Sequence, residues 1–372
     1  MHDAQDIATL TAQVLWAVFV LAAALGALVR QTHFCTMGAV ADIVNLGDWS
    51  RMRMWALAAG VAMLGFNAMV ALGWVRAADT VYGGVRWLWG SALAGGALFG
   101  FGMVLASGCG SKTLVRIGGG NLKSLVVLLV LALSAYATMR GVLGVLRVAT
   151  VDAVALELPV GQDLPSLVAQ ASGASRPWLA LLLGTGLGGA LLAWVLARPD
   201  GRGPDVLLGG IGTGAVIVGV WWVSGQLGFV PEHPTTLEPA FLATNSRRME
   251  SLSFVAPVAY TVDWLILFSD ASRVLTLGIV AVLGVVLGAA LMALAGGSFR
   301  WEGFAGAEDT ANHIVGALLM GAGGVTAMGC TIGQGLSGIS TLALGSFIAL
   351  GGILAGGVLG LRYQAWRVER SL

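Results

Sequence analysis

Nine runs of mainly apolar residues, each about 20 residues long, set the class of fold. They lie at roughly 13–29, 52–75, 87–107, 121–146, 177–197, 207–228, 273–295, 312–328 and 341–363. A helix of about 20 residues spans the roughly 30 Å hydrocarbon core of a bilayer. Only 10% of the residues are charged, against about 25% in an ordinary soluble domain. The sequence therefore predicts an all-α polytopic membrane protein with about nine transmembrane helices.

The sequence also contains an internal duplication. The stretch GSALAGGALFGFGMVLASGCGSKTLVRIGGG resembles the later stretch GALLMGAGGVTAMGCTIGQGLSGIS, because both are rich in small residues and reach Gly-Cys before a glycine-rich polar stretch. Their cysteines, Cys109 and Cys330, lie 221 positions apart. We therefore divide a single membrane domain, 1–372, into repeat A (10–148), a linking segment with one span (149–206) and repeat B (207–372).

Each repeat is interrupted by two short segments. They lie at 35–46 and 110–118 in repeat A and at 251–262 and 331–339 in repeat B. About 8 to 12 residues cannot cross the hydrocarbon core at 1.5 Å per residue, so the sequence predicts four short re-entrant helices. Four spans return repeat A to its starting side, and the linking span crosses once more. The repeats are therefore predicted to be inverted, as in many transporters whose sites lie between their repeats.

The glycine-cysteine motifs are the candidate site. Irregular backbone at membrane depth must be buried in protein or line a water-filled cavity. In GCGSKTLVRIGGG we predict a short helix with Ser111 at or near its N-cap and Gly118 at its end, and in GCTIGQGLSG a similar helix with Thr331 near its start. A helix N-terminus carries unpaired N–H groups and about half a positive charge, which favours anions. Cys109 and Cys330 lie at those starts, where a thiol becomes more acidic and a better hydrogen-bond donor.

Further polar residues extend this site and make it asymmetric. Cys35 lies at the entrance of the first short segment, and the 221-residue shift places Ala256 at the equivalent position. Lys112 is predicted to face the path of the anion. The 221-residue shift maps Lys112 to position 333, and Gln334, one position further on, could offer a neutral hydrogen-bond donor. The predicted substrate-binding residues are Cys35, Cys109, Cys330, Gly108, Gly110, Lys112, Gly329, Thr331 and Gln334.

Asp42 and Asp263 lie at matched positions in the two repeats, followed by Arg51 and Arg273. A structural role, either as helix caps or as ion pairs with these arginines, is the favoured interpretation. The C-terminal tail RYQAWRVERSL carries three arginines, which places it in the cytoplasm by the positive-inside tendency. Nine spans then place the N-terminus in the periplasm.

Several functions are not indicated by the sequence. IGGGNLKS lacks the Gly-Lys-Ser/Thr ending of a phosphate-binding loop, and the net charge of +1 gives no sign of nucleic-acid binding. We predict no enzyme activity, no cofactor and no resident metal ion. The residues leave open a sulfur-transfer protein that forms a persulfide on Cys109 or Cys330, a Cu(I) transporter that uses cysteine and methionine, and a purely structural subunit.

The chain resembles the YeeE/YedE sulphur-transport family of bacterial inner-membrane proteins in FCTMGAVAD, SGCGSKTLVRIGGGNLKS, SLSFVAP and MGCTIGQGLSG. The resemblance implies an hourglass-shaped protein whose short helices meet at a constriction. Cys109 and Cys330, together with Cys35, would there pass thiosulfate inward through S–H hydrogen bonds, and a cytoplasmic sulfurtransferase would receive it. The family can carry another cysteine where this chain has Ala256. Thiosulfate, a related sulfur oxyanion, a sulfide-type species and a selenium analogue therefore all remain candidate substrates.

Overall fold

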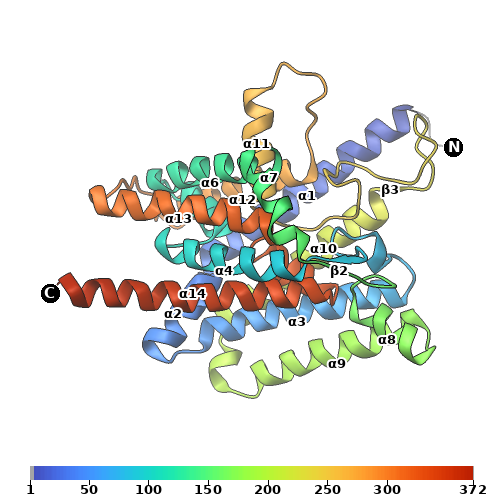
Figure 1. Cartoon of the computed structure of the whole chain (residues 1–372), viewed down its shortest axis with the longest axis horizontal. Helices are drawn as coiled ribbons and strands as arrows, with labels where there is room; N and C mark the ends of the chain where they lie inside the picture. Colours follow the sequence, from blue (N-terminus) through green and yellow to red (C-terminus); the bar gives the residue numbers. More distant parts are fainter. Residues whose placement is uncertain (1–3, 372) are drawn as a thin grey trace.

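The structure is a computed structural model, and it describes residues 4–371. Long helices that lie side by side form its body (Figure 1). Within the described residues, the helices of 17 residues or more are α1 (Ala4–Thr32), α3 (Ser50–Ala71), α4 (Trp89–Leu105), α6 (Leu122–Arg140), α9 (Arg176–Leu196), α10 (Pro204–Trp222), α12 (Leu277–Ala295), α13 (Ala307–Thr326) and α14 (Leu344–Ser371).

These helices coincide with the nine predicted spans. Within residues 4–371, eight helical segments are long and apolar enough to cross a membrane. α13 is 20 residues long but is not among them, and its first turn carries Glu308 and Asp309. One predicted boundary was wrong, because the run at 121–146 is broken at Gly141, whose backbone is extended (φ −101°, ψ −161°). α6 therefore ends at Arg140, and a separate helix, α7 (Val142–Ala149), follows it.

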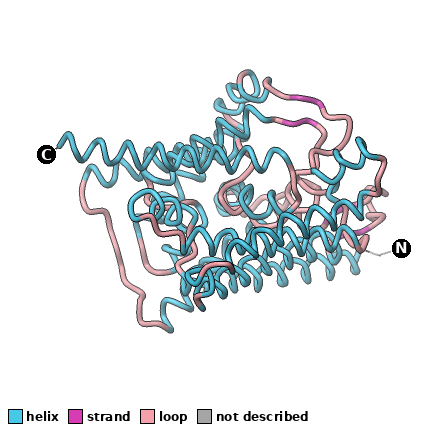
Figure 2. Tube along the Cα trace, turned by 90° about the horizontal axis from the view of Figure 1, so that it is seen from below, coloured by secondary structure: helices cyan, strands magenta, loops and turns pink. Residues whose placement is uncertain are grey.

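The two termini lie at opposite ends of the long axis of the molecule (Figures 1 and 2). Equivalent helices of the two sequence repeats run in opposite directions. Gly212 of α10 faces Leu28 of α1, whereas Gly219 faces Leu21, so these two helices are antiparallel. Glycine contacts show the same antiparallel arrangement for α4 and α13.

Helices of the first half pack mainly on helices of the second half. α1 packs on α12 and α3 on α10, while α4 packs on α14 and α6 on α13. The repeat makes α1 equivalent to α10, α3 to α12, α4 to α13 and α6 to α14. The α1–α12 contact is therefore equivalent to the α10–α3 contact, and the α4–α14 contact to the α13–α6 contact. α9 lies outside this arrangement and packs on α3. The two halves therefore share one continuous apolar core, in which Phe66, Phe99 and Trp221 are fully buried.

Short helical elements occupy the four interruptions. They are α2 (Thr36–Leu46), α5 (Gly110–Gly118), α11 (Ala256–Ile266) and the π-helical element η5 (Gly333–Gly338). The predicted bounds of the first two are confirmed. The third begins later than predicted, since 251–255 is not helical and Pro257 lies in the first turn of α11. The fourth differs from the predicted half-helix because the N–H of Ser337 bonds to the carbonyl of Ile332, five residues back.

The remaining elements are short. They are η1 (Ala77–Asp79), η2 (Val151–Ala153), α8 (Leu164–Ser172), η3 (Pro199–Arg202), η4 (Val223–Leu227), and strands β1 (Arg86–Trp87), β2 (Leu156–Glu157), β3 (Phe229–Val230) and β4 (Ala240–Phe241). Strands β1 and β2 pair antiparallel, as do β3 and β4. α8, β2 and β3 lie toward the end of the molecule that carries the N-terminus (Figure 1).

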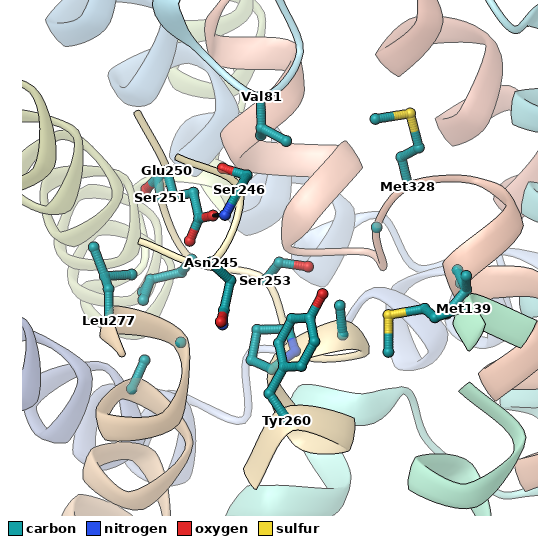
Figure 3. Close-up of a pocket in the computed structure, with 18 of the residues that line it drawn as sticks. Val81, Met139, Asn245, Ser246, Glu250, Ser251, Ser253, Tyr260, Leu277 and Met328 are labelled. Carbon is teal, nitrogen blue, oxygen red and sulfur yellow. Dashed lines mark hydrogen bonds between the residues drawn. The ribbon is translucent and has the colours of Figure 1, made fainter. Parts of the chain in front are cut away.

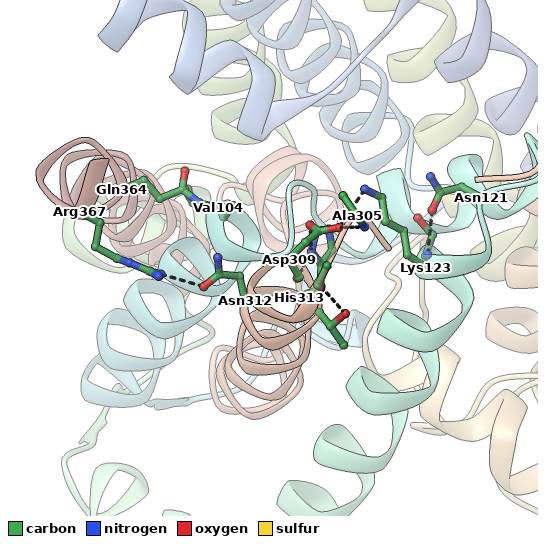
Figure 4. Close-up of polar contacts among 12 residues, drawn as sticks. Val104, Asn121, Lys123, Ala305, Asp309, Asn312, His313, Gln364 and Arg367 are labelled. Atoms are coloured by element: carbon green, nitrogen blue, oxygen red, sulfur yellow. Dashed lines mark hydrogen bonds and ion pairs between the residues drawn. The ribbon is translucent and has the colours of Figure 1, made fainter. Parts of the chain in front are cut away.

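Polar side chains join three long helices near the opposite end (Figure 4). Lys123 at the start of α6 lies 3.6 Å from the Asp309 carboxylate at the start of α13. Arg367 near the end of α14 donates to the Asn312 side chain at 3.0 Å. Because charged groups are costly inside hydrocarbon, this end of the bundle lies outside the hydrocarbon core.

Equivalent ion pairs hold α2 and α11. Arg51 Nε lies 3.2 Å from Asp42 Oδ2, and Arg273 NH1 lies 3.1 Å from Asp263 Oδ2. We expect Asp42→Asn and Asp263→Asn each to cost about 1 kcal/mol, since both arginine side chains are partly exposed and water screens the pairs. Melting temperatures should fall by about 2 °C. Asp270→Asn, at a more exposed carboxylate 3.7 Å from Arg273, is the control and should have a smaller effect. Unchanged melting temperatures in both variants would contradict a structural role for these pairs.

Candidate functional site

The two Gly-Cys motifs form turns of the same geometry. After α4 and α13 the chain passes through left-handed residues, Ser107 (φ 55°) and Met328 (φ 57°). In each turn the following glycine N–H donates to a carbonyl five residues back, at 2.8 Å from Gly108 and at 2.8 Å from Gly329. This is the hydrogen bond of a Schellman motif. The duplicated sequence therefore builds the same helix end twice, and each turn leads directly to a cysteine.

All three cysteines lie at the starts of short helices. Cys35 is the N-cap of α2, and its sulfur accepts the Gly38 N–H at 3.3 Å. Cys330 Sγ accepts the Gly333 N–H at 3.5 Å. Cys109 is the N-cap of α5. The N-cap therefore lies two residues before Ser111, which was predicted at or near that position. Ser111 lies in the first turn, with its hydroxyl 3.2 Å from Cys109 Sγ.

Cys109 is the middle member of the three thiols. It lies within electrostatic range of both Cys330 and Cys35. Cys109 is 2% exposed and Cys330 is 0% exposed, whereas Cys35 is half-buried. Phe254 connects the first two, since its carbonyl lies against Gly110 and its N–H points to the Cys330 sulfur. Cys109 is therefore near enough to interact electrostatically with each of the other two thiols.

Other residues support the irregular backbone of η5. Tyr82 donates its hydroxyl to the Gly333 carbonyl at 2.7 Å, and Ser337 donates to the Leu252 carbonyl at 2.7 Å. Asn67 donates to the Ser340 carbonyl at 2.9 Å. These bonds satisfy carbonyl groups that would be costly to bury alone. They also fix the segment that carries Cys330.

Lys112 and Gln334 occupy comparable positions with different chemistry. The Lys112 side chain lies over Gly108, and the Gln334 side chain lies over Gly329. The Gln334 amide already donates to the Ala327 carbonyl at 2.5 Å, while its buried oxygen has no hydrogen-bond partner among the described residues. The buried hydroxyl of Thr331 is also without such a partner. Gln334 thus presents an acceptor where repeat A presents a cation.

A pocket of about 510 Å³, here called the cationic pocket, opens at one end of α5 and α12. Lys112 and Arg116 lie one turn apart on α5, and neither forms an ion pair with a described carboxylate. Glu302 is engaged by Arg300 at 2.7 Å. The lining residues are Arg30, Lys112, Arg116, Gly119, Asn121, Gly297, Ser298, Phe299, Arg300 and Glu302. The pocket therefore carries a net positive charge.

The positive field extends to the loop between α1 and α2. His33 in that loop lies within electrostatic range of Lys112, Arg51 and Arg30. The cations at the mouth of the cationic pocket therefore attract anions.

A second pocket of about 250 Å³, here called the hydroxyl pocket, lies at the opposite ends of α12 and α13 (Figure 3). α12 begins at the hydroxyl pocket and runs toward the cationic pocket. The polar groups of the hydroxyl pocket are mostly neutral and come from Tyr82, Asn245, Ser246, Ser251, Ser253 and Tyr260. Gly329, next to Cys330, and Ala256 also line it. Neither Cys330 nor Cys109 lines either of these two pockets: Cys330 directly follows Gly329 of the hydroxyl pocket, whose surface is mainly apolar, and Cys109 directly precedes α5, which carries Lys112 of the cationic pocket.

Some residues of these pockets were not predicted from the sequence. Arg116 could have been found, because it lies one helical turn after Lys112 and so shares its face. Arg30 ends a long apolar helix and carried no signal beyond its charge. Ser253 lies in the predicted short segment 251–262 and Glu250 directly before it, and only the tertiary structure places them at the hydroxyl pocket.

Long apolar helices, interrupted by short ones that carry thiols and cations, define a multi-pass membrane protein with a polar site inside its bundle. A family model described as sulphur transport matches residues 31–359, so the chain belongs to this family. It is similar to the thiosulfate transporter TsuA of Spirochaeta thermophila, with 27% identity over 69% of this chain and 72% of that protein. It is also similar to the thiosulfate transporter TsuA of Escherichia coli, with 25% identity over 84% of each chain. The chain is therefore a transporter and not an enzyme, and the resemblance noted in the motifs is confirmed.

Proposed function

We propose that this protein carries thiosulfate, or a related small sulfur anion, inward across the bacterial inner membrane. The path runs from the hydroxyl pocket past Cys330 and Cys109 to Cys35 and the cationic pocket. The observation that supports the proposal is that three thiols lie at or near the starts of short helices, with the neighbouring residues Gly329 and Lys112 lining the hydroxyl pocket and the cationic pocket. The names of the two relatives support thiosulfate as the anion.

The chemistry of the site suits a divalent anion that must move on. Helix N-termini and S–H groups offset part of the cost of removing the anion from water. Neutral thiols are weaker partners than fixed cations, and conduction requires binding that is weak enough to release. The unpaired cations Lys112 and Arg116 lie beyond the thiols. They then favour exit into the cationic pocket.

The proposed topology has two inverted repeats, 10–148 and 207–372, joined by the linking segment 149–206. Antiparallel packing of α1 on α10 and of α4 on α13 supports the inversion. We place the N-terminus in the periplasm and the arginine-containing C-terminus in the cytoplasm. The cationic pocket, on the C-terminal side, would then face the cytoplasm. A cytoplasmic sulfurtransferase is the proposed acceptor, and a constriction at the thiols would give the proposed hourglass shape.

Purified protein in liposomes provides the test of this function. We expect saturable uptake of ³⁵S-labelled thiosulfate that unlabelled thiosulfate blocks and that an equal concentration of sulfate blocks poorly. Sulfate has the same charge but lacks the terminal sulfur that would contact the thiols. Uptake no greater than in protein-free liposomes would overturn the proposal. Equal competition by sulfate would contradict the role assigned to the thiols.

Lys112→Gln should lower thiosulfate uptake about tenfold, because a hydrogen bond to a charged group contributes about 1.5 to 3 kcal/mol. Lys112 has no described carboxylate partner, so the substitution breaks no ion pair. Lys123→Gln is the matched control, since Lys123 is paired with Asp309 at 3.6 Å and does not line the pocket. The same small effect in both variants would contradict a role for Lys112 in the path.

A further inference from the structure

Glu250 is the one carboxyl group among the described residues that line the hydroxyl pocket (Figure 3). It lies in the loop between η4 and α11, and the backbone around it is fixed. Its N–H donates to the buried Ser224 hydroxyl at 3.0 Å. The preceding residue, Met249, is 1% exposed, and its N–H donates to the Asp79 carbonyl at 2.9 Å. The carboxyl group is therefore held at the pocket and does not lie on a free loop.

The Glu250 carboxylate has no positive partner within the described part of the chain. Its oxygen Oε1 accepts the Ser246 N–H at 2.7 Å, a bond drawn in Figure 3. Arg147, the cation that lines the same pocket, is paired with Asp152 at 3.1 Å. Arg248 instead points to the Thr80 carbonyl at 3.4 Å. Hydrogen bonds from the Ser246 side chain, the Ser246 N–H and the Asn245 N–H, with no cation among them, thus compensate for the partial burial of this charge.

Few other charged or titratable groups face Glu250 from the surrounding elements. Tyr82, before α4, and Tyr260, on α11, lie within its electrostatic range and are neutral at ordinary pH. From α7, Arg147 lines the pocket, and α12 and α13 line it with apolar residues and glycines. Burial raises the pKa of Glu250. Its protonated form is therefore favoured at a higher pH than in an ordinary glutamate.

We propose that Glu250 is a proton-binding site that controls entry of the anion, so that its protonated form admits the anion and its carboxylate excludes it. This inference rests on the transport function proposed above. A divalent anion in a pocket of about 250 Å³ meets the carboxylate charge at close range. Protonation removes that repulsion and adds an O–H donor. Anion and proton binding then favour each other, so one proton is taken from water as the anion enters.

The first test measures uptake of labelled thiosulfate by liposomes at external pH values from 5.5 to 8.5. Thiosulfate remains a dianion throughout this range, so its own charge does not change. For the unaltered protein we expect uptake to fall at least about fivefold as pH rises. Glu250→Gln should show a nearly flat profile at a level close to the acidic maximum. Glu232→Gln, at an exposed residue of the same loop, is the control and should keep the original profile. The same pH dependence in Glu250→Gln would overturn the proposal.

A second measurement needs no anion and separates this inference from the transport function. A carboxyl group whose pKa is raised by folding contributes stability at low pH and loses it as pH rises through the folded-state pKa. Relative to Glu250→Gln, the unaltered protein should therefore lose melting temperature between pH 5.5 and 8.5. A melting-temperature difference between the two proteins that stays constant with pH would overturn proton binding at Glu250. If liposomes take up no thiosulfate but the melting-temperature difference between the two proteins still changes with pH, only the transport proposal is overturned.

Discussion

Alanine at Cys109 or Cys330 is expected to lower thiosulfate uptake by about 10- to 100-fold. Each substitution removes one donor to a charged substrate, and such a hydrogen bond is worth about 1.5 to 3 kcal/mol. The alanine side chain is only slightly smaller than the thiol, so the fold should persist. Serine at either position should retain an intermediate rate, because its hydroxyl still donates but lies on a shorter bond. Initial rates in liposomes, normalised to folded protein, measure the effect.

The order of the two substitutions distinguishes transport from packing. If the thiols only fill space, alanine is tolerated and serine is worse, because a buried hydroxyl without a partner costs about 1 to 3 kcal/mol. If the thiols conduct the anion, serine is better than alanine. Ser134→Ala is the control, because it removes a buried polar group at the contact of α6 with α13. Normal uptake by both alanine variants would contradict the assigned path.

Gly288→Leu is expected to prevent accumulation of folded protein. A Cβ atom at Gly288 would lie 1.8 Å from the carbonyl oxygen of Ala23, and backbone atoms cannot turn aside as a side chain can. The contact joins α12 to α1, whose end leads directly to Cys35. Overpacking typically costs about 1 to 3 kcal/mol, and a backbone collision at a long helix contact should exceed that range. Fluorescence-detected size-exclusion chromatography would show the loss of the folded peak.

Gly186→Leu is the matched control for this substitution. Gly186 also lies within a long helix, α9, but apart from its own stretch of helix backbone no heavy atom of the described residues lies within 4 Å of the position that its Cβ would take. Its effect on stability should stay within about 0.5 kcal/mol. Comparable folded yields from the two leucine variants would show that α1 and α12 do not approach as closely as described.

Much of this architecture is predictable because bilayer physics constrains the sequence. The long apolar runs identify the helices, and the duplicated Gly-Cys motifs place Cys109 and Cys330 at helix starts. Of the two structural roles predicted for Asp42 and Asp263, helix caps or ion pairs, the structure shows ion pairs with the following arginines. These inferences succeed because each depends on residues that are close in sequence or repeated.

Other features depend on contacts between distant segments. The π-helical turn of η5 is supported by Tyr82 and Asn67, which lie more than 250 residues before their partners. The break at Gly141 is not predicted because it lies inside the apolar run 121–146, although Arg140 and Gly141 interrupt that run. Glu250 looks like an ordinary loop residue until α11 and α12 form a pocket beside it. Local patterns alone do not predict these features.

A structure of the protein with thiosulfate bound, with its sulfur atoms located by anomalous scattering, tests the proposed path most directly. The path predicts an anion between Cys109 and Cys330, within about 4 Å of both sulfurs, as hydrogen bonds to sulfur require. An anion found only in the cationic pocket, with the two thiols packed on apolar atoms, would contradict it.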